Sequence, residues 1–421
     1  MVTGLKERAA EWDVLLRDRM LPYWRETVDP RGGYRVYDPG DRSWRAQVKS
    51  KIKGETKNES ARGLVSQARL LWVFSHAHLL GYSTSQHDYL KSAAHGYTYL
   101  IETMLDQQHG GCYWKTDVNS GVIEPHKILY GQGMAIYALV EYHRASGLSE
   151  PLEYAGSIHE TVRQKFHDEV HGGWLEHCER DFTPLTCTGE RLPGMPDIVG
   201  FKSGDANLHW MEALTELYAE TQDPSVLVSL METIEILCKK FYPPDVSASR
   251  EYRLPDWKTI DHAEFSGVSH GHMIEFAWLL LHAQETVGTP RDWDYFERLL
   301  RHSLRHGFDH ERGGFYFRGK PNEAADDTTK FWWVQAEGLS ALTEAAAHFE
   351  SDEYNAALDR LVTWILNYQI RSDDGVWIVS TDAGGRPLSI KKAGEWKAAY
   401  HEVRAITKFV QTFAPHDRSQ Q

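Results

Sequence analysis

The segment SGVSHGHMIEFAW contains residue types that could move protons. Its His272 and Glu275 are three residues apart, so on a helix they would share one face. A carboxylate in that position could orient or tune an imidazole, whose pKa near neutrality lets it both accept and donate protons. His401, in WKAAYHEVR near another predicted helix start, is the candidate for the second member of an acid/base pair.

Other interpretations of these histidines are open at this point. His272, Glu275 and His209 could together bind a metal ion, but the sequence holds no zinc signature such as HExxH, so we expect no metal. A single histidine near a helix start, such as His401, is also commonly a structural capping residue. Only the convergence of both histidines on one site would favour catalysis.

Two further segments contain residues that could bind a substrate. In DANLHWMEA, Asn207 and His209 could hydrogen-bond sugar hydroxyl groups, or they could cap a helix and fill the core. In KFWWVQAE, Trp332 or Trp333 could stack on a sugar ring, with Glu337 one helical turn further on. A buried tryptophan pair with a hydrogen-bonded glutamate is the structural alternative.

A recurring turn indicates how the elements around these residues are organised. The segments DPRGGY, DQQHGGCYW, DEVHGGW and DHERGGFYF share an aspartate followed by Gly-Gly, and DDGVW is a shortened version. The interval from Gly172 to Gly313 is about twice the others, so we expect a degenerate turn at YPPDVSAS near residue 242, which makes six units. Gly-Gly supplies the positive φ of a tight reversal, so the motifs themselves are interpreted as structural.

The turns lie between stretches with helical periodicity, which predict twelve helices in six pairs. They are expected at residues 5–27, 59–82, 87–105, 127–147, 151–167, 205–222, 224–241, 269–287, 291–306, 331–349, 353–369 and 397–413. This pattern favours an all-α (α/α)₆ barrel with short hairpins in the connecting loops. We expect a single catalytic domain over residues 1–415, a disordered tail over 416–421, and lids formed by 181–205 and 242–268.

The inner helices of such a barrel would all begin at one mouth. Each Gly-Gly turn follows an outer helix, so the helix after it is inner, and titratable and aromatic residues gather where the inner helices begin. Six converging helix N-termini would also provide a positive field for an anionic intermediate. Arg69 lies in an otherwise apolar inner helix and needs a partner, because burying an unpaired cation is costly. A polar barrel lumen would supply that partner.

The composition argues against several other classes of protein. The net charge of -14 argues against a nucleic-acid partner, which needs a basic face. No apolar run approaches the roughly 20 residues of a membrane span, and the first residues lack the pattern of a signal peptide. Cys112, Cys178, Cys187 and Cys238 have no CxxC spacing, so we expect reduced thiols in a cytoplasmic protein.

Together these segments resemble the N-acylglucosamine 2-epimerase superfamily, which includes cellobiose 2-epimerases and related mannose and sulfosugar aldose–ketose isomerases. The similarity covers nearly the whole chain and depends on the order of ARLLWVFS, KILYGQGMAIYALVEY, NLHWMEALTELY, SHGHMIE, WWVQAE and WKAAYHEVR. It implies that His272 and His401 are the acid/base pair, and that Arg69 holds substrate oxygens near the reacting carbonyl. The other cleft residues that the resemblance implies are Tyr130, His209, Glu275, Trp332, Trp333 and Glu337.

The motifs also depart from the cellobiose 2-epimerase pattern. Met273 replaces the usual Asp, His270 stands where Tyr is common, and Asn207 resembles the isomerase branch. Ala399 and Glu402 alter the last motif. These departures bear on the expected preference for a disaccharide more than on the chemistry.

The resemblance implies proton transfer at C2 of an open-chain aldose through a cis-enediolate. We therefore predict a 2-epimerase of a glucose/mannose-type aldose, free or at the reducing end of a β-linked disaccharide, with no cofactor. An aldose–ketose isomerase of the mannose–fructose type is the first alternative. A glycoside hydrolase that uses Glu275 and Glu337 is the second, and a non-catalytic sugar-binding protein is the third. The expected partner is a small sugar, and the protein would be a monomer or homodimer.

Overall fold

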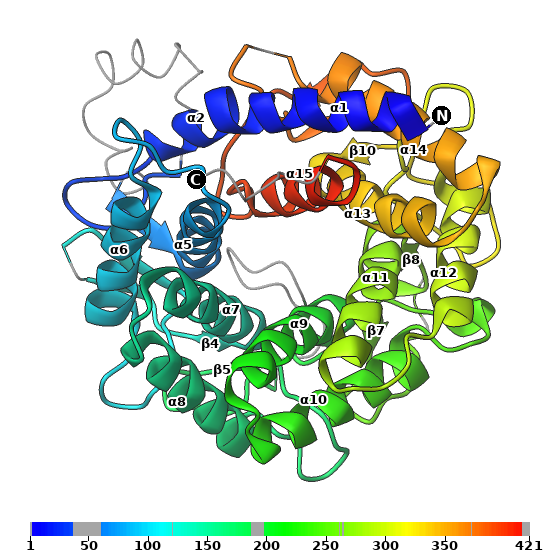
Figure 1. The fold of residues 1–421 in the computed structure, drawn as a ribbon. Helices are drawn as coiled ribbons and strands as arrows, with labels where there is room; N and C mark the ends of the chain where they lie inside the picture. The colour runs from blue at the N-terminus through cyan, green and yellow to red at the C-terminus, as the bar shows by residue number, and fades with distance from the viewer. Residues whose placement is uncertain are drawn as a thin grey trace, which may run out of the picture.

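The chain forms the predicted (α/α)₆ barrel, in which an inner ring of helices is wrapped by an outer ring (Figure 1). The computed structural model describes residues 2–36, 60–119, 121–186, 198–260, 262, 265–371 and 373–414. Part of one predicted lid, residues 187–197, and the predicted tail lie outside the described residues, as does Cys187.

The helices of the two rings alternate along the chain. The inner ring consists of α5 (Leu64–Leu79), α7 (Leu129–Ser146), α9 (Gly204–Thr221), α11 (His270–Thr286), α13 (Trp332–His348) and α15 (Tyr400–Phe413). The outer ring consists of α1 (Val2–Leu15) continued by α2 (Leu21–Arg25), then α6 (Tyr89–Tyr99), α8 (Glu150–Lys165), α10 (Pro224–Ile236), α12 (Trp293–Gly307) and α14 (Asp352–Trp364). These bounds agree with the predicted helices to within a few residues, apart from π-helical turns that join α1 to α2 and extend α6, α10 and α14.

The two rings differ in how much of each helix is buried. Outer helices have one apolar face, and in α12 the polar and apolar residues are cleanly separated. Inner helices are enclosed by the outer ring and line the centre, so almost every residue from Leu64 to Phe74 in α5 is buried, polar ones included. A helix that is buried on all sides must pair its polar groups inside the barrel.

The Asp…Gly-Gly turns each close with an antiparallel bridge, such as Leu105 with Cys112 and Phe308 with Phe315. In four units the turn aspartate also binds a buried cation just before an inner helix. These pairs are Asp29–Arg62, Asp106–Lys127, Asp168–Lys202 and Asp309–Lys330, with nitrogen–oxygen distances between 2.7 and 3.1 Å. At the predicted degenerate turn near 242 the described chain instead makes a 3₁₀ turn, Val246–Ala248.

Short strands connect neighbouring units, as the hairpin prediction required. In five units the strand before the inner helix pairs with a strand that follows the next turn between units. The pairs are β1 (Ala61–Gly63) with β2 (Lys115–Asp117), β4 (Lys127–Ile128) with β5 (His177–Cys178), β6 (Lys202–Ser203) with β7 (Tyr252–Arg253), β8 (Val268–Ser269) with β9 (Arg318–Gly319), and β10 (Lys330–Phe331) with β11 (Ser380–Thr381). Two further strands, β3 (Val122–Glu124) and β12 (Pro387–Ser389), add to the first and last of these pairs.

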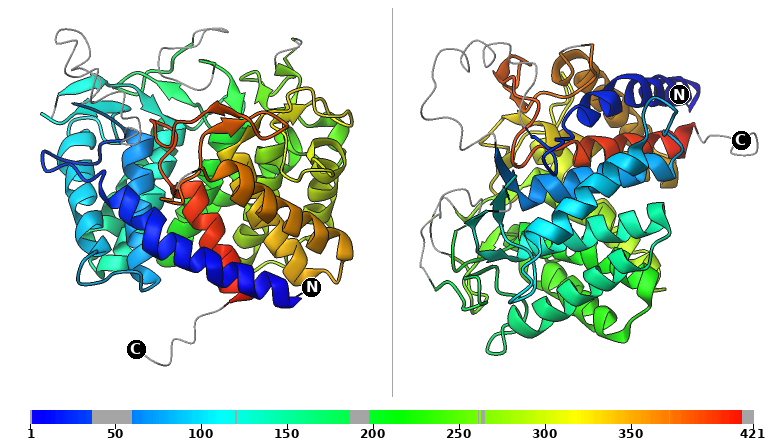
Figure 2. Two further views of the ribbon diagram at one scale, coloured as in Figure 1. Left: turned by 90° about the horizontal axis from the view of Figure 1, so that it is seen from above. Right: turned by 90° about the vertical axis from the view of Figure 1, so that its left-hand side faces the viewer.

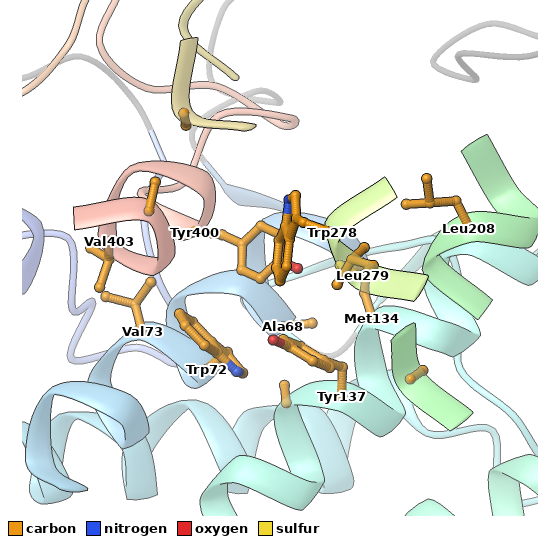
Figure 3. Packing of buried hydrophobic residues seen from close by; sticks show 14 of the residues in the cluster. Ala68, Trp72, Val73, Met134, Tyr137, Leu208, Trp278, Leu279, Tyr400 and Val403 are labelled. Carbon is orange, nitrogen blue, oxygen red and sulfur yellow. The ribbon is translucent and has the colours of Figure 1, made fainter. Parts of the chain in front are cut away.

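Large aromatic side chains from different inner helices meet inside the ring (Figure 3). Trp72 stacks on Tyr137 with ring centroids 5.6 Å apart, and the edge of Tyr400 meets both rings at 5.3 and 5.7 Å. Trp278 of α11 lies beside them (Figure 3). These rings form an aromatic layer inside the inner ring.

The ring closes where the start of the chain meets its end. Helix α1 packs along α15 (Figures 1 and 2). Trp12 of α1 contacts Phe409 of α15 and Trp377 of the last Gly-containing turn, with ring centroids 5.8 and 6.0 Å apart. The first helix therefore completes the outer ring over the last inner helix.

The cysteines and the helix lengths bear on two expectations from composition. Cys112, Cys178 and Cys238 are free thiols in the part of the chain that is described. Among the described residues, no helix has the length and apolar character needed to cross a membrane.

Candidate active site

The polar residues singled out from the sequence gather at the end of the barrel where the inner helices begin. Five inner helices follow directly from a strand, so strands and loops surround this mouth (Figure 2). The side chains of Asp205, Glu251 and His272 are 20%, 15% and 16% exposed, whereas those of Glu275 and Glu337 deeper inside are fully buried. The first three residues are therefore partly open to solvent, and the two glutamates are not.

His401, in the first turn of α15, is held between a carboxylate and a guanidinium. Its Nδ1 lies 2.6 Å from Oε1 of Glu337, and its Nε2 lies 3.1 Å from Nη2 of Arg69. Arginine can only donate, so Nε2 must accept, and the ring proton is then on Nδ1, facing the carboxylate. Burial, together with the positive charges of Arg69 and Arg404, holds the pKa of His401 well below its ordinary value of 6.5. His401 is thus a neutral imidazole with an unprotonated Nε2.

His272, in the first turn of α11, has the opposite surroundings. Its Nδ1 lies 2.7 Å from Oε2 of Glu251, and its Nε2 lies 3.5 Å from Oδ1 of Asp205. Carboxylates only accept, so both ring nitrogens face acceptors and favour the imidazolium. Burial acts to lower the pKa of His272, but the charges of Glu251 and Asp205 outweigh it and raise the pKa to about 10. His272 is therefore protonated at neutral pH.

Glu251 takes the role that residue spacing assigned to Glu275. Glu251 precedes β7, accepts a hydrogen bond from the backbone of Ser269 at 3.0 Å and bonds the ring of His272. Glu275 does follow His272 by one helical turn, but its Oε1 accepts a hydrogen bond from Arg404 at 2.7 Å. Glu275 thus tunes His272 through its charge, as its spacing allowed, while the hydrogen bond that orients the ring comes from Glu251.

Arg404, one turn after His401 on α15, joins three buried carboxylates. Its Nη2 donates to Glu275 at 2.7 Å and to Glu337 at 2.8 Å, and its Nη1 donates to Glu212. Burial and the neighbouring charge of Glu337 raise the pKa of Glu275. The guanidinium therefore fixes Glu337, which in turn fixes the ring of His401.

A metal ion has one candidate position among the described residues. Ligand atoms of Glu275, Glu337 and His401 lie within 4.8 Å of one another. Arg404 already donates a hydrogen bond to both carboxylates, so a metal ion there would compete with the guanidinium for their oxygens. The expectation that the protein uses no metal stays a prediction.

His209 and Tyr130 line the site beside Arg69. Nδ1 of His209 lies 2.9 Å from Glu212, and its ring centroid is 6.3 Å from that of His401. Tyr130 accepts a hydrogen bond from Arg69 at 2.6 Å, and its ring meets His209 edge-on at 4.8 Å. Arg69 thus has the polar partners that its position in an apolar helix required.

The two tryptophans lie differently. Trp333 stacks on His272 with centroids 4.7 Å apart and lies 6.1 Å from His401, so its indole contacts both histidines. The ring of Trp332 is buried under the ammonium group of Lys397, at 5.3 Å. Only Trp333 is therefore placed beside the two histidines.

Asn207 is the predicted site residue with the least access to the cleft. Its side chain is fully buried and donates to the backbone oxygen of Ser203 at 2.8 Å and to Glu176 at 3.4 Å. Both contacts hold the start of α9. Asn207 is therefore packed in the core at the start of α9, whose cap is Ser203, and its contact with a sugar stays a prediction.

Sequence reasoning missed four charged residues of this site: Asp205, Glu212, Glu251 and Arg404. The argument that located Arg69, a cation within an apolar inner helix, applies equally to Arg404. Glu212 follows His209 by three residues, which is the spacing considered for His272 and Glu275. Nothing in the local sequence marks Glu251, because it lies in a connecting segment and reaches His272 from outside α11.

Comparisons with known proteins find sequence and fold similarity over nearly the whole chain. A family model described as N-acylglucosamine 2-epimerase (GlcNAc 2-epimerase) matches residues 48–405. The chain is 26% identical over 400 residues to a cellobiose 2-epimerase of Dictyoglomus turgidum, covering 94% of this chain and 96% of that protein. It is 24% identical over 410 residues to a D-mannose isomerase of Marinomonas mediterranea, covering 93% and 94%. The solved cellobiose 2-epimerase of Spirochaeta thermophila superposes with a TM-score of 0.81 at 27% identity, covering 98% of both chains.

Proposed function

The chain belongs to the N-acylglucosamine 2-epimerase family, and from this premise we propose that it is a sugar 2-epimerase. Because it belongs to this family, the chain is a carbohydrate epimerase or isomerase. The proposed reaction interconverts the C2 epimers of a glucose/mannose-type aldose, either free or at the reducing end of a β-linked disaccharide.

The observation that carries the proposal is the contrast between the surroundings of two histidines at one mouth. Nε2 of His401 faces the guanidinium of Arg69, whereas the two ring nitrogens of His272 face the carboxylates of Glu251 and Asp205. Two groups whose surroundings push their pKa values apart are suited to act as base and acid at the same pH. Epimerisation needs such a pair, since one group removes a proton and another returns it to the opposite face.

In the proposed mechanism, one histidine opens the ring of the sugar and leaves a carbonyl at C1. Nε2 of His401 then removes the proton from C2, and the electron pair of that bond forms the C1–C2 double bond of a cis-enediolate with its negative charge on O1. His272 returns a proton to the other face of C2 while the C1 carbonyl re-forms. His401 ends protonated and His272 neutral, and exchange with solvent restores both.

Arg69 supplies positive charge next to the base. Its guanidinium is fixed by the backbone oxygen of Trp396 and by Tyr130, so it need not reorganise as the enediolate forms. The N-termini of the inner helices add to the positive potential at this mouth. Each step moves only protons between side chains and sugar, so the proposal includes no cofactor.

The main alternative is an aldose–ketose isomerase of the mannose–fructose type. Similarity to a D-mannose isomerase over 93% of the chain supports it. The same His401 could carry the proton from C2 to C1 on one face, which would give a ketose. We favour epimerisation because a second, already protonated histidine is in place on Trp333.

Hydrolysis has less support from the geometry. The two carboxylates that a glycoside hydrolase would use, Glu275 and Glu337, are fully buried and share Nη2 of Arg404. A hydrolase needs one of the pair as a free acid and the other as a nucleophile or base facing the glycosidic bond. Both carboxylates instead serve to hold Arg404 and His401.

One experiment separates these functions. The enzyme is incubated in D₂O with mannose, glucose, fructose, cellobiose and N-acetylglucosamine, and products and deuterium are followed by NMR. Epimerisation predicts that mannose yields glucose with deuterium at C2, and that cellobiose yields its 2-epimer if disaccharides are accepted. Fructose as the main product would establish the isomerase instead, and absence of turnover for every sugar would refute both.

A further inference from the structure

Asp205, which no sequence pattern singled out, lies between two histidines of the site. It is in the first turn of α9, and α9 is the neighbour of α11 in the inner ring (Figure 1). Oδ1 of Asp205 lies 3.4 Å from Nε2 of His209, one turn further along the same helix. The same oxygen lies 3.5 Å from Nε2 of His272 on α11. One carboxylate oxygen therefore faces the outer nitrogens of both rings.

The inner nitrogens of both rings are already occupied. Nδ1 of His209 is bound to Glu212 at 2.9 Å, and Nδ1 of His272 is bound to Glu251 at 2.7 Å. Nε2 is therefore the only nitrogen of either ring that can reach a substrate, and Asp205 is what it faces in the free protein. At 3.4–3.5 Å these are charge contacts, longer than well-formed hydrogen bonds. A sugar oxygen can displace them at little cost.

The usual structural role of an acid in a first helical turn does not account for Asp205. The cap of α9 is already filled, because Oγ of Ser203 accepts the hydrogen bond of the Ala206 backbone nitrogen at 3.1 Å. The side chain of Asp205 is 20% exposed and directed at the two rings. Its interaction with the helix dipole is a general effect that any acid at a helix start would have.

From this geometry we propose that Asp205 is a positioning residue of the reaction: its carboxylate holds Nε2 of His209 and His272 in place and keeps the proton on His272 until the sugar replaces it. This inference depends on the proposed function for its catalytic part. The contrast with the other histidine supports it, because Nε2 of His401 faces the cation Arg69. A carboxylate next to Nε2 favours the protonated form of His272, which then serves as the acid. A guanidinium next to Nε2 favours the neutral form of His401, which then serves as the base.

The charges around His272 show what Asp205 contributes. The groups that face it are Asp205 from α9, Glu251 from the segment before β7, Glu275 from its own helix and the uncharged ring of Trp333 from α13. Burial alone would lower the pKa of His272. Glu251 and then Asp205 are the largest contributions in the opposite direction. An opposite charge at this range commonly shifts a pKa by about 1–3, so loss of Asp205 should be measurable.

The first test is an NMR titration of the full-length protein without sugar. The imidazole signals of the wild type and of Asp205→Asn are followed with pH, and the His272 signal is assigned with His272→Gln. We expect the titration midpoint of His272 to fall by about one pH unit or more in Asp205→Asn. An unchanged midpoint would overturn the proposal. Because no sugar is present, this result stands even if the proposed function fails.

The second test measures kcat/KM against pH with the substrate identified in D₂O. Asp205→Asn should move the alkaline limb of the profile to lower pH by the same amount as the NMR midpoint, with the acid limb unchanged. An alkaline limb that stays in place would overturn the catalytic part of the proposal. Asp352→Asn is the matched control, since Asp352 is an exposed acid in the first turn of outer helix α14. It should change neither measurement.

Discussion

Arg69 of α5 and His401 of α15 meet where the first and the last inner helix pack together, and Nη2 of Arg69 lies 3.1 Å from Nε2 of His401. The contact places a fixed positive charge against the lone pair of the ring. His272 has no such neighbour, because carboxylates face both of its nitrogens. The pKa values of the two histidines are therefore shifted in opposite directions.

The first prediction concerns the pH dependence of turnover. His401 must be neutral to accept a proton, and its pKa is depressed, so activity should rise with pH through a limb below 6.5. His272 must be protonated to donate, and its pKa is about 10, so activity should fall only as the pH rises through that value. A profile of kcat/KM from pH 4 to 11 should therefore be flat across neutrality. An acid limb above pH 6.5 would contradict the assignment of His401.

The second prediction concerns the two histidines themselves. His272→Ala and His401→Ala should each lower kcat by about 10²–10⁴-fold, the usual contribution of a general acid or base. Neither should unfold the barrel, which circular dichroism can check. His282→Ala is the control, because His282 lies on α11 with His272 but pairs with Glu216 towards the other end of the barrel. If either active-site variant keeps near-normal rates, the assigned pair is wrong.

The third prediction concerns Arg404. Arg404→Met would leave Glu212, Glu275 and Glu337 buried without their shared cation, which should cost about 3–5 kcal/mol in the free energy of unfolding. Arg163→Met is the control: Arg163 and its partner Glu160 are both 43% exposed, and such surface pairs contribute less than about 1 kcal/mol. Urea denaturation measures both. Equal losses in the two variants would show that the buried carboxylates do not depend on Arg404.

The fourth prediction concerns one of the recurring turns. Gly313 has a φ of +84°, and a Cβ there would collide with the backbone oxygen of Arg360. Gly147, after α7, has a φ of +70° with open space around it. Gly147→Ala should therefore cost only the left-handed strain of about 1–2 kcal/mol, and Gly313→Ala about 1–3 kcal/mol more. Thermal unfolding of the two variants should show this order, and a reversed order would rule out the steric explanation.

Much of the architecture follows from local sequence patterns. Helical periodicity placed the helices, and the repeated Asp…Gly-Gly turn gave the sixfold order. Both signals are local, since they depend on residues that are neighbours in the chain. The turn aspartates were interpreted only as turn residues, although four of them bind buried cations such as Lys127 and Lys330. Those cations come from the strand before the next inner helix, 21 residues further along, so the pairing appears only when the chain is folded.

The site was predictable in its histidines but not in the groups that set their protonation. Burial and carboxylates compete at His272, and the outcome depends on Glu251 and Asp205, which arrive from other units of the barrel. Arg404 reaches Glu212, which is 192 residues earlier, across the centre of the ring. Spacing along one helix favoured Glu275 as the partner of His272, whereas the partner that forms the bond comes from outside that helix.

The contact of α1 with α15 has a consequence for how the chain folds. Neighbouring units are joined by short strand pairs and by the ion pairs of the turn aspartates. Both connect segments that are close in sequence, so each unit can pack as soon as its neighbour has formed. The contact between Trp12 and Phe409 instead joins two segments that are separated by nearly the whole length of the chain. Closing so long a loop has the largest entropic cost of any contact described above. The packing of α1 on α15 offsets that cost only when the rest of the ring is in place. The contact between α1 and α15 is therefore expected to form after the contacts between neighbouring units.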